Sequence, residues 1–233
     1  MSNENWSKDE LKILVKFYPA IGARVKEFLP QRSESSLRHK ASRLGIGYKD
    51  LAMGKVGFFD IESSGLQADF GFMYSWYIKT LGEDEYFHAV VTQDEIRDGT
   101  LDKRIVEELV ETLKKYKRIY SYYGSRFDIP FCRTRALSHG LNFVPYGLVE
   151  HRDLWYLARR ILRLHRNRLE NVCEILGIEG KTHLKPHIWI MANTGNEDAL
   201  EYIATHNKMD VIILEKVFKR LSEFEARNAR RYM

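Results

Sequence analysis

Four carboxylates interrupt apolar stretches of this chain, and they are the residues best suited to chemistry. The stretches read VGFFDIESSGL, YGSRFDIPF and HNKMDVIIL, and they carry Asp60, Glu62, Asp128 and Asp210. Carboxylates rarely enter buried segments unless something compensates their charge. If the four converge, they would bind divalent cations well, because Mg²⁺ and Mn²⁺ prefer hard oxygen ligands.

The first two acids lie at the end of an expected buried strand. Residues 56–61 form a near-continuous apolar run rich in Phe, Val and Ile, which is typical of such a strand. Residues two apart on a strand share a face, so Asp60 and Glu62 point the same way before residues 63–65 end the strand. Paired carboxylates at a strand end suit a metal site. Two acids at a solvated strand exit are the alternative.

The other two acids lie on expected helices. Asp128 follows the strand-like run RIYSYY and falls in the first turn of a helix, where an acid also complements the helix dipole. Asp210 lies in a segment with apolar residues at helical spacing, and His206 is four residues earlier on the same face. Such a pair could act in catalysis, or it could be an ordinary structural pair.

In their order and residue patterns, the three segments resemble the exonuclease motifs of the DEDD superfamily, the 3′→5′ exonucleases with an RNase H-like fold. FDIESSGL resembles the first motif, YGSRFDIPF the second and HNKMDV the third. The resemblance covers residues 55–221 and is strongest to domains related to polymerase proofreading domains. It implies metal-dependent 3′→5′ hydrolysis of phosphodiester bonds, with DNA favoured over RNA as the substrate.

Two positions depart from that pattern. The tyrosine branch of the superfamily has Tyr four residues before the last Asp, and the histidine branch has His five residues before it. Here His206 has the spacing of the first branch and the side chain of the second, and Thr205 occupies the five-before position. The second motif often carries Asn where this chain has Tyr123.

The resemblance also implies roles for the residues around the acids. Asp60, Glu62 and Asp210 would hold one Mg²⁺ or Mn²⁺ ion, and Asp60 and Asp128 a second, in a two-metal mechanism. His206 would accept a proton from the attacking water. The nucleic acid would be contacted by residues that follow the first motif or precede the second Asp: Ser63, Leu66 and Tyr123.

The first 47 residues predict a separate unit of three short helices. The first is indicated by the helical spacing of Trp6, Leu11 and Leu14, with Ser7 as its expected cap. A second covers 23–29, and Ser33 or Ser35 caps a third that ends at Gly45. The pattern resembles Myb/SANT-like helix-turn-helix domains. That resemblance implies a DNA-facing set of residues: Arg32, Arg38, His39, Lys40 and Arg43. A small protein-binding module is the alternative.

Charge is unevenly distributed along the chain. Residues 1–50 hold ten Lys and Arg against six Asp and Glu, so this segment carries +4 of the net +5. Such an excess favours contact with DNA phosphates. A further basic segment is expected over 223–233, with Arg227, Arg230 and Arg231. The sequence does not identify protein partners.

Composition fits a globular protein of two domains. No apolar run is long enough for a membrane span, and we interpret Cys132 and Cys173 as reduced core thiols of a cytoplasmic protein. Domains are expected over 1–47 and 55–222. Strands are expected over 55–62, 70–80, 85–91, 118–123 and 148–152, and helices over 102–115, 126–139, 153–164, 168–176 and 198–221. Residues 177–197 are expected to form a loop with one helical turn.

This order predicts an α/β fold, an RNase H-like mixed sheet flanked by helices. The sequence therefore favours a metal-dependent 3′→5′ exonuclease acting on DNA, joined to a helix-turn-helix. An RNase or structure-specific nuclease on the same fold is one alternative. A DNA-binding regulator that uses the fold as a scaffold is the other, although a scaffold has no reason to keep four buried charges.

Overall fold

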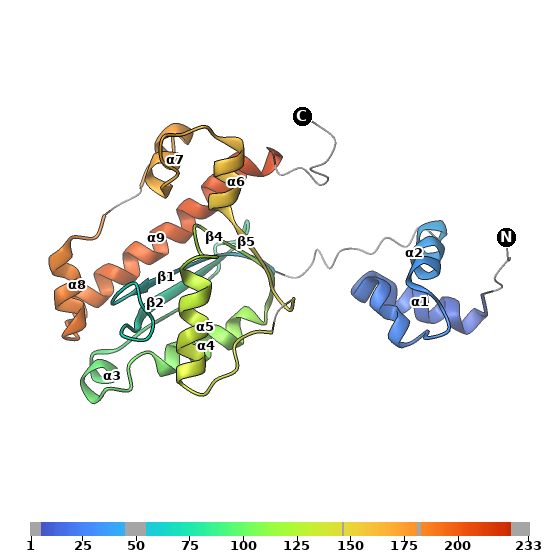
Figure 1. Ribbon diagram of the computed structural model, residues 1–233, viewed down its shortest axis with the longest axis horizontal. Helices are drawn as coiled ribbons and strands as arrows, with labels where there is room; N and C mark the ends of the chain where they lie inside the picture. The colour runs from blue at the N-terminus through green and yellow to red at the C-terminus, as the bar shows by residue number, and fades with distance from the viewer. Residues whose placement is uncertain (1–5, 45–54, 146, 181–182, 225–233) are drawn as a thin grey trace. The chain divides into compact units, whose positions relative to one another are not determined.

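The chain forms two compact units. The computed structural model describes residues 6–44, 55–145, 147–180 and 183–224 (Figure 1). The units comprise residues 1–54 and 55–233, and each has a hydrophobic core of its own. The predicted end of the third helix at Gly45, and residues 225–233 of the predicted basic tail, lie outside the described residues.

The smaller unit is helical. It contains α1 (Lys8–Ile21), the 3₁₀ helix η1 (Gly22–Glu27) and α2 (Glu34–Arg43). The Ser7 hydroxyl accepts a hydrogen bond from the Glu10 amide at the start of α1, and Ser33 caps α2 in the same way. The second helix, predicted over 23–29, is a 3₁₀ turn. Pro30 disfavours helical backbone in the residue before it, and short segments often take this tighter form.

The larger unit is built on a five-stranded mixed sheet. Its strands are β1 (Lys55–Ser63), β2 (Met73–Thr80), β3 (Tyr86–Val90), β4 (Tyr116–Ser121) and β5 (Glu150–Asp153). Their order is β3-β2-β1-β4-β5. The first three strands pair antiparallel, and β1, β4 and β5 pair parallel. The carboxyl ends of these three parallel strands therefore meet at one edge.

Helices cover both faces of the sheet, which confirms the predicted fold class (Figure 1). They are α3 (Gln93–Asp98), α4 (Lys103–Leu113), α5 (Asp128–Ser138), α6 (Leu154–Ile161), α7 (Leu169–Leu176), α8 (Pro186–Asn193) and α9 (Glu197–Leu221), followed by the 3₁₀ turn η2 (Ser222–Phe224). The pair α4 and α5 packs on one face, and α9 crosses the other with α6 and α7 against it.

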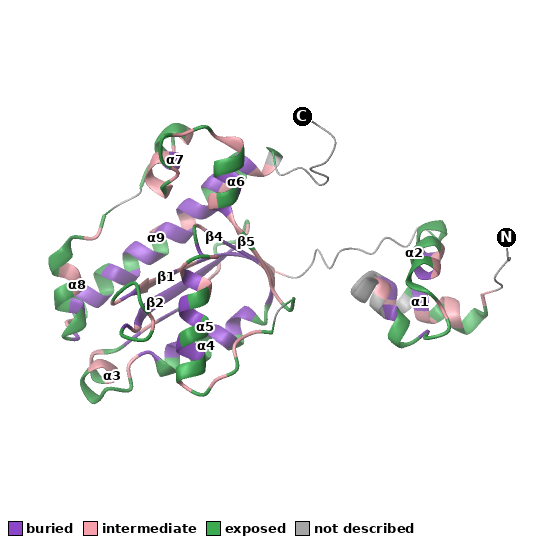
Figure 2. Ribbon diagram, in the orientation of Figure 1, coloured by how far each residue is buried: buried purple, intermediate pink, exposed green. Residues whose placement is uncertain are grey.

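Side chains of β1 alternate between two cores. Phe59 and Ile61 pack in the core that contains α4 and α5, whereas Phe58 packs in the core with α6, α7 and the second half of α9. Figure 2 shows most of β1, β2 and β4 and the inner sides of these helices as buried. Because strand residues two apart share a face, Asp60 and Glu62 are directed to the face that α9 covers.

Two helices in the larger unit were not predicted from the sequence. Pro186 begins α8 inside the predicted loop 177–197, since proline is well tolerated in the first turn. The short α3 begins with a capping box in which Thr92 and Glu95 bond each other's backbone. In the part of the chain that is described, no helix is long and apolar enough to cross a membrane. Cys132 and Cys173 are free and buried, as predicted.

Candidate functional site

The first strand delivers two acids to the face beneath α9. In the pairing with β2, Asp60 lies opposite Tyr77 and Glu62 opposite Ser75. Both acids are half-buried, while the residues beside them, Phe59 and Ile61, are buried on the other face. The shared face that the sequence predicted for the two carboxylates is therefore observed.

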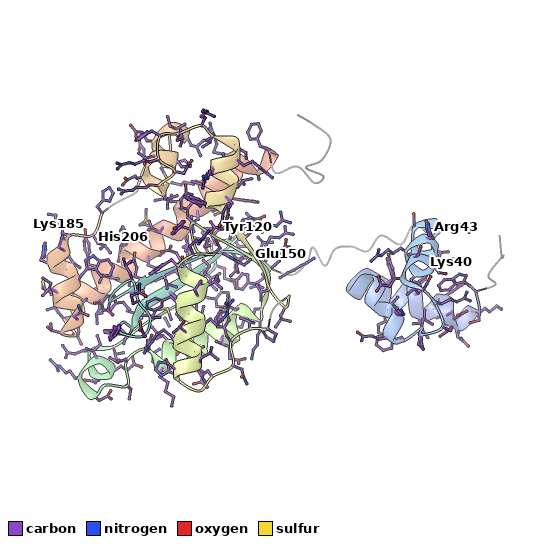
Figure 3. The ribbon with its side chains drawn as sticks, viewed as in Figure 1. Lys40, Arg43, Tyr120, Glu150, Lys185 and His206 are labelled. Carbon is purple, nitrogen blue, oxygen red and sulfur yellow. The ribbon has the colours of Figure 1, made fainter. Side chains whose placement is uncertain are left out.

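Helix α9 brings a histidine and a third acid to the same place. Nε2 of His206 lies 3.7 Å from Oε1 of Glu62 and 3.6 Å from Oδ2 of Asp210. One ligand atom from each of these three residues lies within 4.8 Å of the others. His206, labelled in Figure 3, is 8% exposed and Asp210 is 5% exposed, so the cluster is largely shielded from solvent.

Asn207 fixes this part of α9 to the sheet. Its side-chain amide donates to the carbonyl oxygen of Ser75 at 3.2 Å and to the Ser75 hydroxyl at 3.0 Å. Ser75 faces Glu62 across the strand pair, so the contact anchors the helix beside the acid cluster. The sequence reasoning missed Asn207. Asn207 is fully buried in α9. A polar residue among the apolar positions of this helix was the signal that could have identified it.

Asp128 reaches the site from the start of α5. Its Oδ1 accepts a hydrogen bond from the Ile61 amide at 3.2 Å, between the two acids of β1. The pairing of β1 with β4 ends at Phe58 and Tyr120, and Asp128 bonds the strand beyond that point. Burial raises the pKa of Asp128 to about 7; backbone hydrogen bonds oppose this, and the charges of Asp153 and Asp210 add to it.

The turn between β4 and α5 is tightly held. Asp153 accepts hydrogen bonds from the Tyr123 amide at 2.8 Å, the Ser125 amide at 3.0 Å and the Ser125 hydroxyl at 2.6 Å. It also caps α6 through the Trp155 amide. Sequence reasoning missed the contacts to the turn because Asp153 lies far from the second motif in the chain.

This turn imposes backbone requirements on two neighbouring residues. Tyr123 has φ of 65°, in the left-handed region that is unfavourable for a bulky side chain. A Cβ atom at Gly124 would lie 2.1 Å from the Ser121 hydroxyl oxygen and 3.0 Å from Oδ2 of Asp128. Glycine is required at this position mainly because a Cβ would overlap the Ser121 side chain, and the same backbone also passes close to the Asp128 carboxylate.

The segment after Glu62 carries the two remaining residues predicted to contact nucleic acid. The hydroxyl of Ser63 donates to the carbonyl oxygen of Gly65 at 2.8 Å, so this group serves the local turn. The Ser64 hydroxyl accepts from the Phe72 amide at 2.9 Å and closes the loop. Leu66 projects into solvent with 81% of its surface exposed. Nucleic-acid contact by Ser63, Leu66 and Tyr123 stays a prediction.

The basic residues predicted to face DNA in the smaller unit have two kinds of surroundings. The guanidinium of Arg32 bonds both carboxylate oxygens of Glu10, at 2.8 and 3.0 Å, and lies 4.5 Å from the Trp6 ring centre. Arg32 therefore holds this unit together. The other four lie on α2, where His39 and Arg43 are exposed, Arg38 pairs with Glu34 and Lys40 is half-buried near Trp6 (Lys40 and Arg43 in Figure 3). Their contact with DNA stays a prediction.

The donor set of the larger unit fits a divalent cation. Carboxylate oxygens of Glu62 and Asp210 and an imidazole nitrogen of His206 converge within 4.8 Å, and hard cations select such oxygen-rich sites. Asp128 adds a carboxylate whose pKa is raised by burial and by two neighbouring acids. A bound cation would offset that excess of negative charge.

The larger unit is similar to known proteins in sequence and in fold. A family model described as the RNase H superfamily matches residues 57–222. A DNA polymerase of Methanocaldococcus jannaschii is 30% identical over an alignment of 141 residues that covers 49% of this chain and 8% of that protein. The family B DNA polymerase structure from Pyrobaculum calidifontis superposes with a TM-score of 0.59 at 18% identity, over 73% of this chain and 25% of that one. The structural likeness shows the fold, and the chain spans a small part of either relative.

Proposed function

The chain belongs to the RNase H superfamily, and from that premise we propose that it is a metal-dependent 3′→5′ exonuclease acting on DNA. The observation that carries the proposal is the meeting of Glu62, His206 and Asp210 from β1 and α9. Asp60 shares the face of Glu62, and Asp128 bonds the backbone between them. The similarity to a DNA polymerase favours DNA as the substrate.

The acids are proposed to hold two divalent cations, with Asp60, Glu62 and Asp210 at one position and Asp60 and Asp128 at the other. Such ions lower the pKa of water and stabilise charge on a departing oxygen. The chain itself fixes the carboxylates. Strand β1 sets the spacing of the first pair, and the Asn207 contact to Ser75 sets the approach of α9.

His206 is the proposed proton acceptor. Its Nε2 lies within 3.7 Å of both Glu62 and Asp210. An imidazole titrates in the range that a general base needs near neutral pH. His206 is four residues before Asp210, so the two side chains share a helical face and the imidazole lies beside the acids.

The smaller unit is proposed to bind duplex DNA as a Myb-like helix-turn-helix. Support comes from the basic excess of residues 1–50 and from the surface of α2, where His39 and Arg43 are exposed. A purely regulatory role for the whole chain is less well supported. A scaffold without chemistry would be more stable if apolar residues replaced its buried acids.

End-labelled oligonucleotides test the activity. Single-stranded DNA, duplex DNA and RNA carrying a 5′ label should be incubated with Mg²⁺, Mn²⁺ or EDTA. A ladder that shortens from the 3′ end, requires metal and is fastest with DNA is expected. Hydrolysis undiminished in EDTA would refute the metal requirement, a faster reaction with RNA would reassign the substrate, and early release of the labelled 5′ nucleotide would reverse the direction.

Substitutions in the same assay test the residues. Asp60→Ala and Asp210→Ala should each remove nearly all activity, whereas Asp198→Asn, an exposed acid on the same helix as Asp210, should not. His206→Ala should lower turnover by about 10²–10⁴-fold, the usual contribution of a general base. His206→Tyr should keep much of it if the main task is to orient water. Near-wild-type turnover of His206→Ala would remove this residue from the mechanism.

A further inference from the structure

A small cavity lies beside the candidate site, at the same edge of the sheet. It has a volume of about 320 Å³ and is lined by Tyr122, Tyr123, Trp155, Asn167, Arg168 and Leu169. This volume lies at the lower end of the range of ligand pockets, roughly 300–1,000 Å³. We propose that the cavity binds one unpaired nucleobase of the DNA strand whose 3′ end lies at the acids. The inference rests on the proposed function and extends it to a substrate-binding position.

The position of the cavity follows from the sheet. Strands β1 and β4 run parallel and end at the same edge, so the residues after β4 lie beside the acids that end β1. Tyr123 is separated from Asp128 by one tight turn, in which a Cβ at Gly124 would be 3.0 Å from the Asp128 carboxylate. A strand held at the acids therefore has the cavity within a short distance along its backbone.

Aromatic rings form one wall of the cavity. The rings of Tyr123 and Trp155 meet edge to face, with centres 5.3 Å apart and planes at 72°. Tyr123 is nevertheless 46% exposed, so much of the ring remains accessible. A base stacks on such a ring whatever its identity, because every base has a π face. An exonuclease that removes successive nucleotides requires this tolerance.

The backbone of the turn holds Tyr123 in place. Its φ of 65° is costly for a tyrosine, and Asp153 offsets the cost by bonding the amides of Tyr123 and Ser125. The same carboxylate caps α6 at Trp155. Asp153 thus sets the positions of both aromatic residues, which is consistent with a preformed surface for stacking.

Cationic groups lie at the edge of the cavity, and Asn167 contributes to its lining. Arg168 lies at the rim with 67% of its side chain exposed, and Arg159 lies 5.1 Å from the Trp155 ring centre. Positive charge here complements DNA phosphates, which the acids of the site repel.

Binding of a fluorescent strand tests the proposal in the full chain. Asp210→Asn prevents hydrolysis, and single-stranded DNA 12-mers carry 2-aminopurine at one position, moved stepwise from the 3′ end. Quenching of 2-aminopurine is expected at one or two adjacent positions, where the base stacks on Tyr123. An abasic nucleotide there should weaken binding by about 5- to 100-fold, the range for loss of one stack.

Three further substitutions in the same background identify the cavity. Tyr123→Asn removes the ring while suiting the left-handed backbone, so it should abolish the quenching and weaken binding without unfolding the chain. Arg168→Ala should reduce the slope of log affinity against log salt by about one unit. Arg220 is an exposed arginine at the end of α9, and Arg220→Ala is the control. This substitution should change neither the quenching nor the salt dependence of affinity. Unchanged quenching and affinity in Tyr123→Asn would overturn the proposal.

Hydrolysis kinetics of variants that retain Asp210 test the cavity and the proposed nuclease activity separately. Tyr123→Asn should raise KM for single-stranded DNA with little change in kcat. An unchanged KM would refute the cavity and leave the nuclease standing. Absence of hydrolysis by the unsubstituted chain would refute the nuclease, while the quenching experiment would still decide the cavity. Tyr123-dependent quenching with RNA and not with DNA would overturn the assignment to DNA.

Discussion

Two buried carboxylates of the larger unit have opposite surroundings. Asp102 is fully buried and bonds the Arg135 guanidinium at 2.7 Å, His139 at 2.8 Å and the Met73 amide at 2.8 Å. Asp128 is 3% exposed, yet it accepts a backbone amide and has the charges of Asp153 and Asp210 nearby. The pKa of Asp102 is lowered and that of Asp128 is raised.

The difference separates a structural acid from a candidate functional one. The Asp102 network is neutralised within the chain, and Arg135 also bonds the carbonyl oxygen of Ala68, which fixes the loop between β1 and β2. At Asp128 the neighbouring charges are negative, and the proposed cation would compensate them. Burial alone does not distinguish the two sites, whereas the charge of the neighbours does.

The sharpest contrast is expected from Asp128→Asn. The amide oxygen still accepts the Ile61 N–H, but a carboxylate is lost, so we expect nearly all activity to disappear. Without metal, the free energy of unfolding should stay the same or rise, because an unfavourable buried charge is removed. Activity assays and urea unfolding in EDTA measure both effects. A strongly destabilised Asp128→Asn chain would contradict the assignment of this acid to function.

Arg135→Met should have the reverse effect. It leaves the charge of Asp102 buried and poorly compensated, and breaking such a pair costs about 3–5 kcal/mol of folding free energy. Arg104→Met is the matched control, since its pairs are partly exposed and such pairs contribute about 0–1 kcal/mol. Urea unfolding compares the two. Equal losses would mean that the buried network is no more important than a surface one.

Asn207→Ala should weaken the acid cluster without removing a carboxylate. Loss of its two bonds to Ser75 should cost about 1–3 kcal/mol of stability. Metal affinity or activity should fall by about 10–100-fold, as for other residues that orient ligands. Titration of activity with Mg²⁺ measures the second effect. A lowered stability with unchanged metal dependence would show that Asn207 only packs the helix.

The smallest expected effect is a dependence of stability on acid pH. Burial raises the pKa of Asp102, but bonds from Arg135, His139 and Met73 outweigh it and hold this pKa below the ordinary value of 3.8. A lowered pKa contributes stability above the unfolded-state value, and the contribution is lost as pH falls through the folded-state value. Unfolding midpoints below pH 3.8 should therefore fall less steeply in Arg135→Met. An identical slope would refute the linkage.

Much of this organisation was predictable from local patterns. Asp60 and Glu62 were placed on one face from the two-residue period of a strand, and His206 with Asp210 from the helical period. The strand order and the helices that flank the sheet matched the predicted class. These predictions succeeded because each depends on a repeat that a short segment contains.

Features that depend on distant partners were not predictable. Asp153 caps a helix, but it also bonds a turn about 30 residues earlier. Asn207 meets Ser75 across 132 residues of sequence. Helix α8 is longer than the single helical turn predicted within 177–197, and it begins at Pro186 because proline is well tolerated in the first turn. Long-range hydrogen bonds leave no periodic signal in the sequence.

The left-handed backbone of Tyr123 has a consequence for how this protein would evolve. At such a position Asn or Gly is favoured over an aromatic residue by about 1 kcal/mol or more. A laboratory selection for heat resistance alone should therefore enrich the variants Tyr123→Asn and Tyr123→Gly in its early rounds. If the ring serves the substrate, those lineages would gain thermal tolerance and lose fitness when nucleic acid turnover is restored as the criterion.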